Sequence, residues 1–267
     1  MGSADYFEFL RDALAASHGA VLAARKRGDS ARSLGSGYYG DETFQVDKDA
    51  EDAVVAVASA YFDSPVIISE ERGKVEGKGP WILMDPVDGS TNAKRDASVY
   101  ATAIAVAEGD DFGSIVAAGV IDHVARRVIW GDADGVYEDW HPAATSGRKE
   151  LADAMVTFDS KLYALEKREA DRIASAMSRT KYPRMLSTAA LETAYVASGR
   201  VDAYVAPYGR LRAFDCFPSL FMLDAAGGKA SVDWQAIRRT KLDTKERVGY
   251  VAAASEELLQ AILRALR

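Results

Sequence analysis

Two apolar segments that each lead directly into acidic residues constrain this chain more than any other feature of its sequence. Residues 66–68 are followed by Glu70, and residues 81–84 are followed by Asp85 and Asp88. Short apolar runs bounded by polar turn residues are typical of buried strands. Strand ends give a rigid frame for functional groups, so we expect these three carboxylates to lie close together.

Carboxylates that are buried close together repel one another and take up protons unless cations lie between them. Mg²⁺ suits such a cluster, because it takes oxygen ligands and is usually held by few carboxylates together with water and substrate phosphate. A second interpretation stays open, since Asp85-Pro86 and Asp88-Gly89 are also ordinary turn-forming dipeptides.

The residues that follow the acidic pair favour the site over the simple turn. Gly89, Ser90 and Thr91 are small, and they precede a polar segment that could begin a helix. Small residues let backbone N–H groups approach an anion, and a helix N-terminus favours phosphate. Asp215, at the start of an apolar helix after an irregular loop over 207–212, is placed to add a further carboxylate. Metal ions beside a phosphate cradle are typical of phosphate-ester hydrolysis.

Composition excludes several other classes of protein. Of 267 residues, 48% are hydrophobic and 27% charged, as in soluble globular proteins. Acidic residues outnumber basic ones by 40 to 33, and this balance argues against nucleic-acid or anionic-membrane partners. The N-terminus has acidic residues where a signal peptide needs positive charge, and one cysteine, Cys216, allows no internal disulfide. We therefore expect a cytoplasmic protein.

The order of elements predicts an α+β and α/β chain in two subdomains. We expect an N-terminal α+β subdomain over 1–145, with an antiparallel sheet and most metal ligands, and a C-terminal α/β subdomain over 146–267 that supplies Asp215 and substrate contacts. A stretch rich in Gly, Ser and Tyr predicts a mobile loop over 33–40, and two runs on either side of a Gly-Asp-Asp turn predict a hairpin of strands 101–107 and 115–122. Further on, hydrophobic periodicity predicts these elements: a strand at 154–158, helices at 163–179, 188–198 and 215–226, and strands at 201–205 and 248–253.

Four motifs in order resemble those of the inositol monophosphatase family, whose members are magnesium-dependent, lithium-sensitive phosphatases. The family's D-P-[ILV]-D-G-[ST]-x-N signature is complete over 85–92. Its acidic N-terminal element matches 46–51, its G-E-E element matches 69–71, and its W-D and distal G-G match 214–228. The departures are conservative: Ser69 stands for Gly, Ser90 for Thr and Phe214 for Trp. The resemblance implies the layered αβαβα sugar-phosphatase fold and a homodimer.

The resemblance also implies two to three Mg²⁺ ions in each active site. Glu70, Asp85 and the Val87 carbonyl would hold the first ion. Asp85, Asp88 and Asp215 would hold the second, and a looser third ion would lie near Glu70. The catalytic residues implied by the family are Asp47, Glu70 and Ser90, with Ser90 and Asp47 orienting and deprotonating the attacking water.

For the substrate, the resemblance implies a phosphorylated sugar or polyol. Phosphate would accept hydrogen bonds from the Gly89 and Ser90 amides. The chain lacks the Glu that animal-type members use to grip inositol, and it has a basic segment over 207–212 that is closer to archaeal-type enzymes acting on inositol 1-phosphate and fructose 1,6-bisphosphate. Arginine pairs oxyanions bidentately, so we expect arginines at a second phosphate. The full set of predicted substrate-binding residues is Asp88, Gly89, Ser90, Thr91, Arg184, Ala189, Arg210 and Arg212.

Three functional alternatives remain open from the sequence. Within the family, a 3′(2′),5′-bisphosphate nucleotidase, an NADP phosphatase or a histidinol phosphatase would have the same motifs. A phosphatase that forms an aspartyl-phosphate would need its aspartates two residues apart, and here they are three apart. A non-enzymatic, protein-binding regulator is the third. The histidines His18, His123 and His141 have no zinc-ligand spacing.

Overall fold

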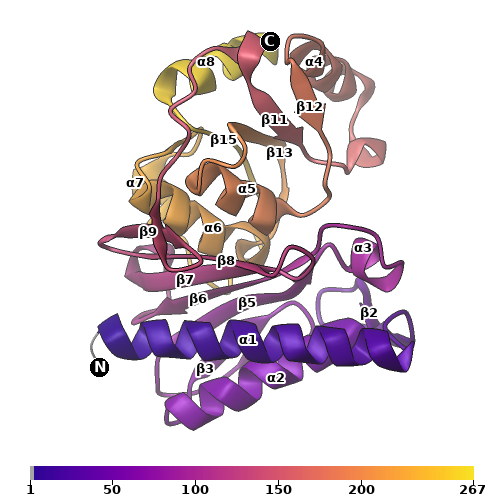
Figure 1. The fold of residues 1–267 in the computed structure, drawn as a ribbon, viewed down its shortest axis with the longest axis vertical. Coiled ribbons are helices and arrows are strands. Elements are labelled where there is room, and N and C mark those ends of the chain that lie inside the picture. The colour runs from indigo at the N-terminus through magenta and orange to yellow at the C-terminus, as the bar shows by residue number, and fades with distance from the viewer. Residues whose placement is uncertain (1–2) are drawn as a thin grey trace.

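The chain folds into alternating layers of helices and sheets. The computed structural model describes the backbone of residues 3–267 and the side chains of residues 6–267. Figure 1 shows a helix pair, a large sheet, a second helix pair, a smaller sheet and an outer helix layer. The predicted αβαβα layering is confirmed.

The first layer is formed by α1 (Ser3–Arg27) and α2 (Gln45–Tyr61), which run side by side across one face of the large sheet. Phe9, Leu10 and Leu14 recur at helical spacing in α1 and are buried with Val54 of α2. This apolar stripe explains why both helices lie flat on the sheet.

The large sheet has eight strands, in the spatial order β10-β9-β8-β7-β6-β5-β3-β4. Only β3 and β5 are parallel neighbours, so their carboxyl ends, which carry the acidic residues, meet at one edge. In chain order the strands are β3 (Val66–Ser69), β4 (Gly73–Val75), β5 (Trp81–Asp88), β6 (Ala101–Ala107), β7 (Ile115–Asp122), β8 (Arg127–Asp132), β9 (Gly135–Glu138) and β10 (His141–Ala143).

The middle layer is α5 (Ala189–Ala197) and α6 (Ala213–Ala225), which lie between the two sheets (Figure 1). Both helices are apolar on nearly every side, as a helix covered on both faces must be. Leu191, Phe217 and Leu220 are fully buried in the largest core cluster, whose members come from both sheets. The ends of these helices therefore reach the same edge as the acidic strand ends.

The second sheet has five strands, in the order β12-β11-β13-β15-β14. Helices α4 (Lys167–Ser178) and α8 (Glu256–Ala265) form the outer layer above it, and α3 (Ser90–Lys94) and α7 (Trp234–Ile237) are short. The strands are β11 (Met155–Phe158), β12 (Tyr182–Arg184), β13 (Ala203–Leu211), β14 (Lys229–Ala230) and β15 (Val248–Ala253).

Three local predictions were wrong. The expected loop over 33–40 contains β1 (Ser33–Ser36), which pairs with β2 (Glu42–Phe44). The expected helix over 163–179 is a 3₁₀ turn followed by α4, because Glu169 accepts a hydrogen bond from the Glu166 N–H at 3.0 Å and starts the helix there. The expected irregular loop over 207–212 is mostly strand: β13 continues to Leu211 through a register shift.

The predicted boundary at residue 145 falls between the two sheets, since β10 ends at Ala143 and β11 begins at Met155. The division into subdomains 1–145 and 146–267 stays a prediction, because the central core cluster draws on both sides of it. Over residues 3–267, no helix has the length and apolar character needed to cross a bilayer.

Candidate active site

A cleft of about 510 Å³ lies where the carboxyl ends of β3 and β5 meet the first turns of α5 and α6. Residues from both halves of the chain line it. From the N-terminal half they are Asp41, Glu42, Phe44, Glu70, Glu71, Asp85, Val87, Asp88, Gly89, Ser90, Thr91, Asn92 and Lys94; from the C-terminal half they are Asp159, Ser160, Lys161, Tyr163, Ser187, Thr188, Ala189, Leu211, Arg212 and Asp215.

Four of the predicted metal ligands are carboxylates that line this cleft together: Glu70, Asp85, Asp88 and Asp215. Burial raises the pKa of Asp88 to about 7 and raises the pKa of each of the other three. The charges of Glu70, Asp88, Asp215 and Asp47 further raise the pKa of Asp85. Mutual repulsion of this kind requires that the five groups lie close together, as the sequence predicted.

Three of these carboxylates have protein partners in this structure. Asp88 accepts a hydrogen bond from the Leu191 N–H at 3.0 Å, and Asp215 accepts one from the Arg212 N–H at 2.8 Å. The Arg212 guanidinium donates to Glu70 at 2.6 Å. The two helix N-termini and one arginine thus fix the directions of the carboxylates.

The donor set fits a hard divalent cation. The Asp85 Oδ1 atom is buried and has no hydrogen-bond partner, as expected of an oxygen reserved for a cation. As the side chains stand within residues 3–267, no group of three or more His, Cys, Asp or Glu is close enough to hold a metal ion. The Arg212–Glu70 ion pair supplies positive charge to the cluster in this arrangement.

Asp47 and Ser90 lie beside the acidic cluster. The Asp47 Oδ2 accepts a hydrogen bond from the Phe44 N–H at 2.8 Å, and its Oδ1 is buried without a partner. Burial raises the pKa of Asp47 to about 7, while the hydrogen bond from the Phe44 N–H lowers it. The Ser90 hydroxyl donates to the Val87 carbonyl at 2.9 Å.

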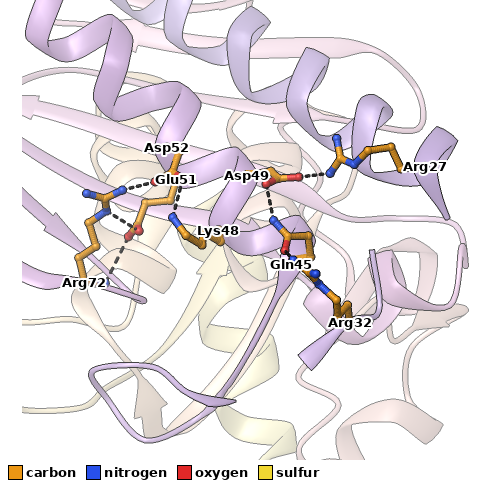
Figure 2. Close-up of polar contacts among 8 residues, drawn as sticks. All are labelled: Arg27, Arg32, Gln45, Lys48, Asp49, Glu51, Asp52 and Arg72. Carbon is orange, nitrogen blue, oxygen red and sulfur yellow. Dashed lines mark hydrogen bonds and ion pairs between the residues drawn. The ribbon is translucent and has the colours of Figure 1, made fainter. Parts of the chain in front are cut away.

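The remainder of the acidic N-terminal element has a structural role. Figure 2 shows Arg72 reaching Glu51 and Asp52 on α2. Asp49 pairs with Arg27 at the end of α1, and Gln45 binds Arg32 in the segment that follows α1. Glu51 also accepts a hydrogen bond from the Ser69 hydroxyl. This network ties the helix that carries Asp47 to the strand end that carries Glu70.

The turn from β5 into α3 forms one wall of the cleft. Gly89 has a φ of +87°, which favours glycine, and a Cβ at this position would lie 2.7 Å from Thr188 Cγ2. Gly89, Ser90, Thr91 and Ala189 all line the cleft, as predicted for substrate contacts.

The three candidate arginines differ in position. Arg212 is almost fully buried at the cleft and pairs with both Glu70 and Asp41. The structure does not bring the other two to the cleft. Arg210 turns toward Ala164 and Glu169, and Arg184 is exposed and donates to the Pro183 carbonyl at 2.9 Å. They lie on β12 and β13 of the second sheet, and neither of them lines the cleft.

A sequence profile of the inositol monophosphatase family matches residues 5–267, nearly the whole chain. The protein belongs to the inositol monophosphatase family. It is therefore a phosphoric monoester hydrolase, and its acidic cleft is the candidate active site of that activity.

Relatives within the family have several names. A fructose-1,6-bisphosphatase/inositol-1-monophosphatase from Methanothermobacter thermautotrophicus is 30% identical over 249 residues, which cover 89% of this chain and 88% of the relative. A Nus factor SuhB from Pseudomonas aeruginosa is 29% identical over 202 residues, or 72% of each chain. A Pyrococcus horikoshii protein described as similar to inositol-1 monophosphatase has the same fold, with a TM-score of 0.80, 23% identity and full coverage of both chains.

Sequence reasoning missed two lysines and a tyrosine in this cleft. Lys161 lowers the pKa values of Asp88 and Asp215, and Lys94 lowers that of Asp47. Lys161 and Tyr163 follow β11, a short apolar strand. The rule that identified Glu70, polar residues directly after a buried strand, could have identified them as well.

Proposed function

We propose that this protein is a magnesium-dependent phosphomonoesterase that hydrolyses inositol 1-phosphate, fructose 1,6-bisphosphate or both by direct attack of water. One observation carries the proposal: four carboxylates from three separate segments of the chain line one cleft beside the Gly89–Thr91 turn. Burial is the main cause of their raised pKa values, and the charges of neighbouring carboxylates raise the pKa of Glu70, Asp85 and Asp88 further. An anionic phosphate could not bind there unless positive charge were added.

The residues that would hold magnesium are those whose oxygens face the cleft. Glu70, Asp85 and the Val87 carbonyl form one candidate set, and Asp85, Asp88 and Asp215 form the other. When bound, Mg²⁺ neutralises these carboxylates, polarises the phosphate ester and lowers the pKa of water. The free Asp85 Oδ1 supports its place in both sets.

Asp47 and Ser90 are suited to handle the proton of the attacking water. A general base works best with a pKa near the operating pH, and the pKa of Asp47 is raised to about 7. Its free Oδ1 accepts a proton, and the neighbouring Ser90 hydroxyl orients the donor. The Gly89 and Ser90 amides are the proposed donors to the phosphate oxygens.

The cations at the rim favour a substrate with more than one anionic group. Lys161 and Arg212 line the cleft with the acidic cluster, so Lys161 replaces Arg184 and Arg210 as the candidate partner of a second phosphate beside Arg212. When a cation binds Glu70, the Arg212 guanidinium would have to leave Glu70 and pair with the substrate instead.

A nucleotide phosphatase is the second candidate within the family. Tyr163 lines the cleft with 90% of its surface exposed, and an exposed aromatic ring offers a stacking surface for a base. Turnover of 3′-phosphoadenosine 5′-phosphate or NADP that falls on Tyr163→Ala would favour this candidate.

The likeness to a protein named Nus factor SuhB raises a further possibility, a regulatory role beside catalysis. Such a role would persist in a catalytically silent variant. We also propose a cytoplasmic homodimer that is sensitive to lithium, and sedimentation at several protein concentrations tests the subunit count.

The test of the proposed function is phosphate release in Mg²⁺, with and without Li⁺. The substrate panel is inositol 1-phosphate, fructose 1,6-bisphosphate, 3′-phosphoadenosine 5′-phosphate and NADP. Asp88→Asn should lower kcat by more than about 100-fold. Removing a residue that only supports a metal ligand already costs about 10–100-fold, and Asp88 is itself a proposed ligand. Asp224→Asn is the control, because Asp224 lies on the same helix as Asp215 but pairs with Arg238 on the surface. Full turnover by Asp88→Asn would contradict the metal assignment.

A further inference from the structure

Strand β5 contains a β-bulge between the two aspartates of the acidic signature. Asp85 pairs with Ala103 of β6 and Asp88 pairs with Ala101, so two residues of β5 oppose Thr102 alone. Side chains three residues apart on a regular strand point to opposite faces. Because a bulge places two residues against one, the extra residue turns Asp88 back to the same face of the sheet as Asp85.

The consequence for the site follows from the pairing. Ala101 and Ala103 both belong to the core cluster between the two sheets, which surrounds α5 and α6. Asp85 and Asp88, as their partners, therefore face that side of the sheet, where Asp215 lies in the first turn of α6. Without the bulge, one of the two aspartates would face α1 instead.

Thr102 holds this bulge in place. Its hydroxyl donates to the Pro86 carbonyl at 2.5 Å, and its side chain is fully buried. Proline has no N–H for the ladder, and its carbonyl in the bulge would otherwise need another donor. Because Thr102 alternates with two alanines of the inner core, its side chain lies on the α1 side of the sheet.

Thr102 is itself held by two neighbours on that side. The Ser17 hydroxyl of α1 lies 2.6 Å from Thr102 Oγ1, and His123 Nε2 lies 2.9 Å from the same atom. His123 Nδ1 in turn lies 3.2 Å from His18 Nδ1, with the two rings nearly parallel. His123 is buried, and burial lowers its pKa to about 3, so it is neutral.

The carbonyl of Pro86 fixes the direction of every proton in this chain of hydrogen bonds. A carbonyl only accepts, so Thr102 spends its single proton on Pro86. Ser17 and His123 Nε2 must then both donate to Thr102 Oγ1. Neutral His123 carries its proton on Nε2, and its bare Nδ1 accepts a proton from His18 Nδ1.

We propose that the hydrogen-bonded chain His18–His123–Thr102 is a positioning element that fixes the Pro86–Val87 bulge and so turns Asp85 and Asp88 toward the same cleft. Thr102 and His123 touch no substrate, and they act through the Pro86 carbonyl. The part of this inference that concerns magnesium rests on the proposed function. The arrangement of protons and of the bulge does not.

The first test uses metal-free wild-type protein and therefore does not depend on catalysis. Nitrogen NMR of the histidine rings should show a protonated Nε2 and a bare Nδ1 for His123, and a protonated Nδ1 for His18. The opposite tautomer of His123 would overturn the proposed chain of donors. This NMR measurement uses the wild-type protein alone, so it does not depend on the folding of any variant.

The second test compares Thr102→Val, which keeps the shape and removes the hydroxyl, with Thr102→Ser, which restores it. In metal-free protein, amide hydrogen exchange over residues 85–90 should be at least about tenfold faster in Thr102→Val, because the Pro86 carbonyl loses its donor and Ser17 and His123 lose their acceptor. Thr102→Ser should exchange at the wild-type rate. Thr180→Val is the matched control, because Thr180 is a buried threonine that donates to the Ala176 carbonyl at 2.9 Å at the end of α4.

The third measurement is the dissociation constant for Mg²⁺ by calorimetry. It should rise about tenfold in Thr102→Val and stay unchanged in Thr102→Ser and Thr180→Val. Faster exchange over residues 85–90 in Thr102→Val with unchanged Mg²⁺ affinity would overturn the positioning role. Exchange in Thr102→Val at the wild-type rate would overturn it as well. If wild-type protein bound no Mg²⁺, the proposed function would fail, while the exchange and NMR results would still decide whether the bulge is held as described.

Discussion

At the scale of single residues, Arg212 adds a positive charge to the acidic cleft. Its guanidinium pairs with Glu70 at 2.6 Å and stacks near Tyr39 and Phe214, so its position is well defined. The same guanidinium is the nearest candidate for a second substrate phosphate. Because the Arg212 guanidinium can pair with Glu70 or with a second phosphate, it should bind a bisphosphate differently from a monophosphate.

Arg212→Ala should raise KM for fructose 1,6-bisphosphate by about tenfold or more, because a hydrogen bond to a charged group contributes about 1.5–3 kcal/mol. KM for inositol 1-phosphate should change much less. Steady-state kinetics on both substrates make the comparison. Arg210→Ala is the matched control, since Arg210 turns toward Glu169, away from the cleft. An equal loss on both substrates would contradict the assignment.

Sequence alone could not separate these two arginines. They are two residues apart in one basic segment, and the pattern treated them alike. The structure separates them because Arg210 lies within β13 and Arg212 directly precedes α6. Four carboxylates could be predicted, by contrast, because each stands at a strand end or a helix start that the apolar pattern marks.

At the scale of elements, the turn between β5 and α3 depends on one glycine. Gly89→Ala should lower the free energy of unfolding by about 1–2 kcal/mol, the cost of a left-handed backbone at a residue with a side chain. The contact at 2.7 Å with Thr188 Cγ2 should add to this cost and displace the amides that we propose bind phosphate, lowering kcat. Chemical denaturation and kinetics measure the two effects.

Gly19→Ala is the control for that substitution. Gly19 lies within α1 with open space around its Cβ position, so alanine there should stabilise the protein by about 0.5–1 kcal/mol. If both variants were stabilised alike, the strained turn at Gly89 would not be a structural requirement.

Helix α5 contains a buried carboxyl that should make stability depend on pH. Burial raises the pKa of Glu192 to about 8, and its side chain accepts a hydrogen bond from the Thr188 N–H at 2.9 Å. The folded protein keeps this proton to about pH 8, whereas the unfolded chain releases it near its ordinary value of 4.5. The stabilisation is therefore complete below the unfolded value and is lost as the pH rises toward 8.

Glu192→Gln, which cannot titrate, should remove that loss. In chelator, Tm of the wild type should fall relative to the variant between about pH 5 and about pH 8. Glu166→Gln, at an exposed position before α4, controls for the change in net charge. Parallel curves for wild type and Glu192→Gln would show that Glu192 is ionised in the folded state.

The end of strand β5 is an element boundary that the sequence did not predict. Strand β5 was expected to end at Met84, because Asp85-Pro86 is typical of a turn. It continues to Asp88 because Thr102 and His123, far along the chain, hold the bulge that Pro86 requires. A local pattern contains no record of such partners, although it predicted the strands and helices around them.

At the scale of the whole molecule, magnesium should add to stability. A ligand that binds only the folded state at about 100 times its dissociation constant contributes about 2.7 kcal/mol. Thermal denaturation should show a higher Tm in Mg²⁺ than in chelator at matched ionic strength. Asp88→Asn should lose most of this increase and Asp224→Asn should keep it. An increase of equal size in Asp88→Asn would indicate unspecific ion binding.

The helix layer between the two sheets determines when during folding the acidic residues first meet. Glu70 and Asp85 come from the first sheet, whereas Asp215 begins a helix that can dock only after the second half of the chain has been made. Glu70, Asp85 and Asp88 therefore repel one another within the first sheet, and the repulsion between Asp215 and Glu70 is added only when α6 docks. A cation that relieves the repulsion by Asp215 should act mainly by slowing the first step of unfolding, and the proposed magnesium would then protect the folded protein kinetically.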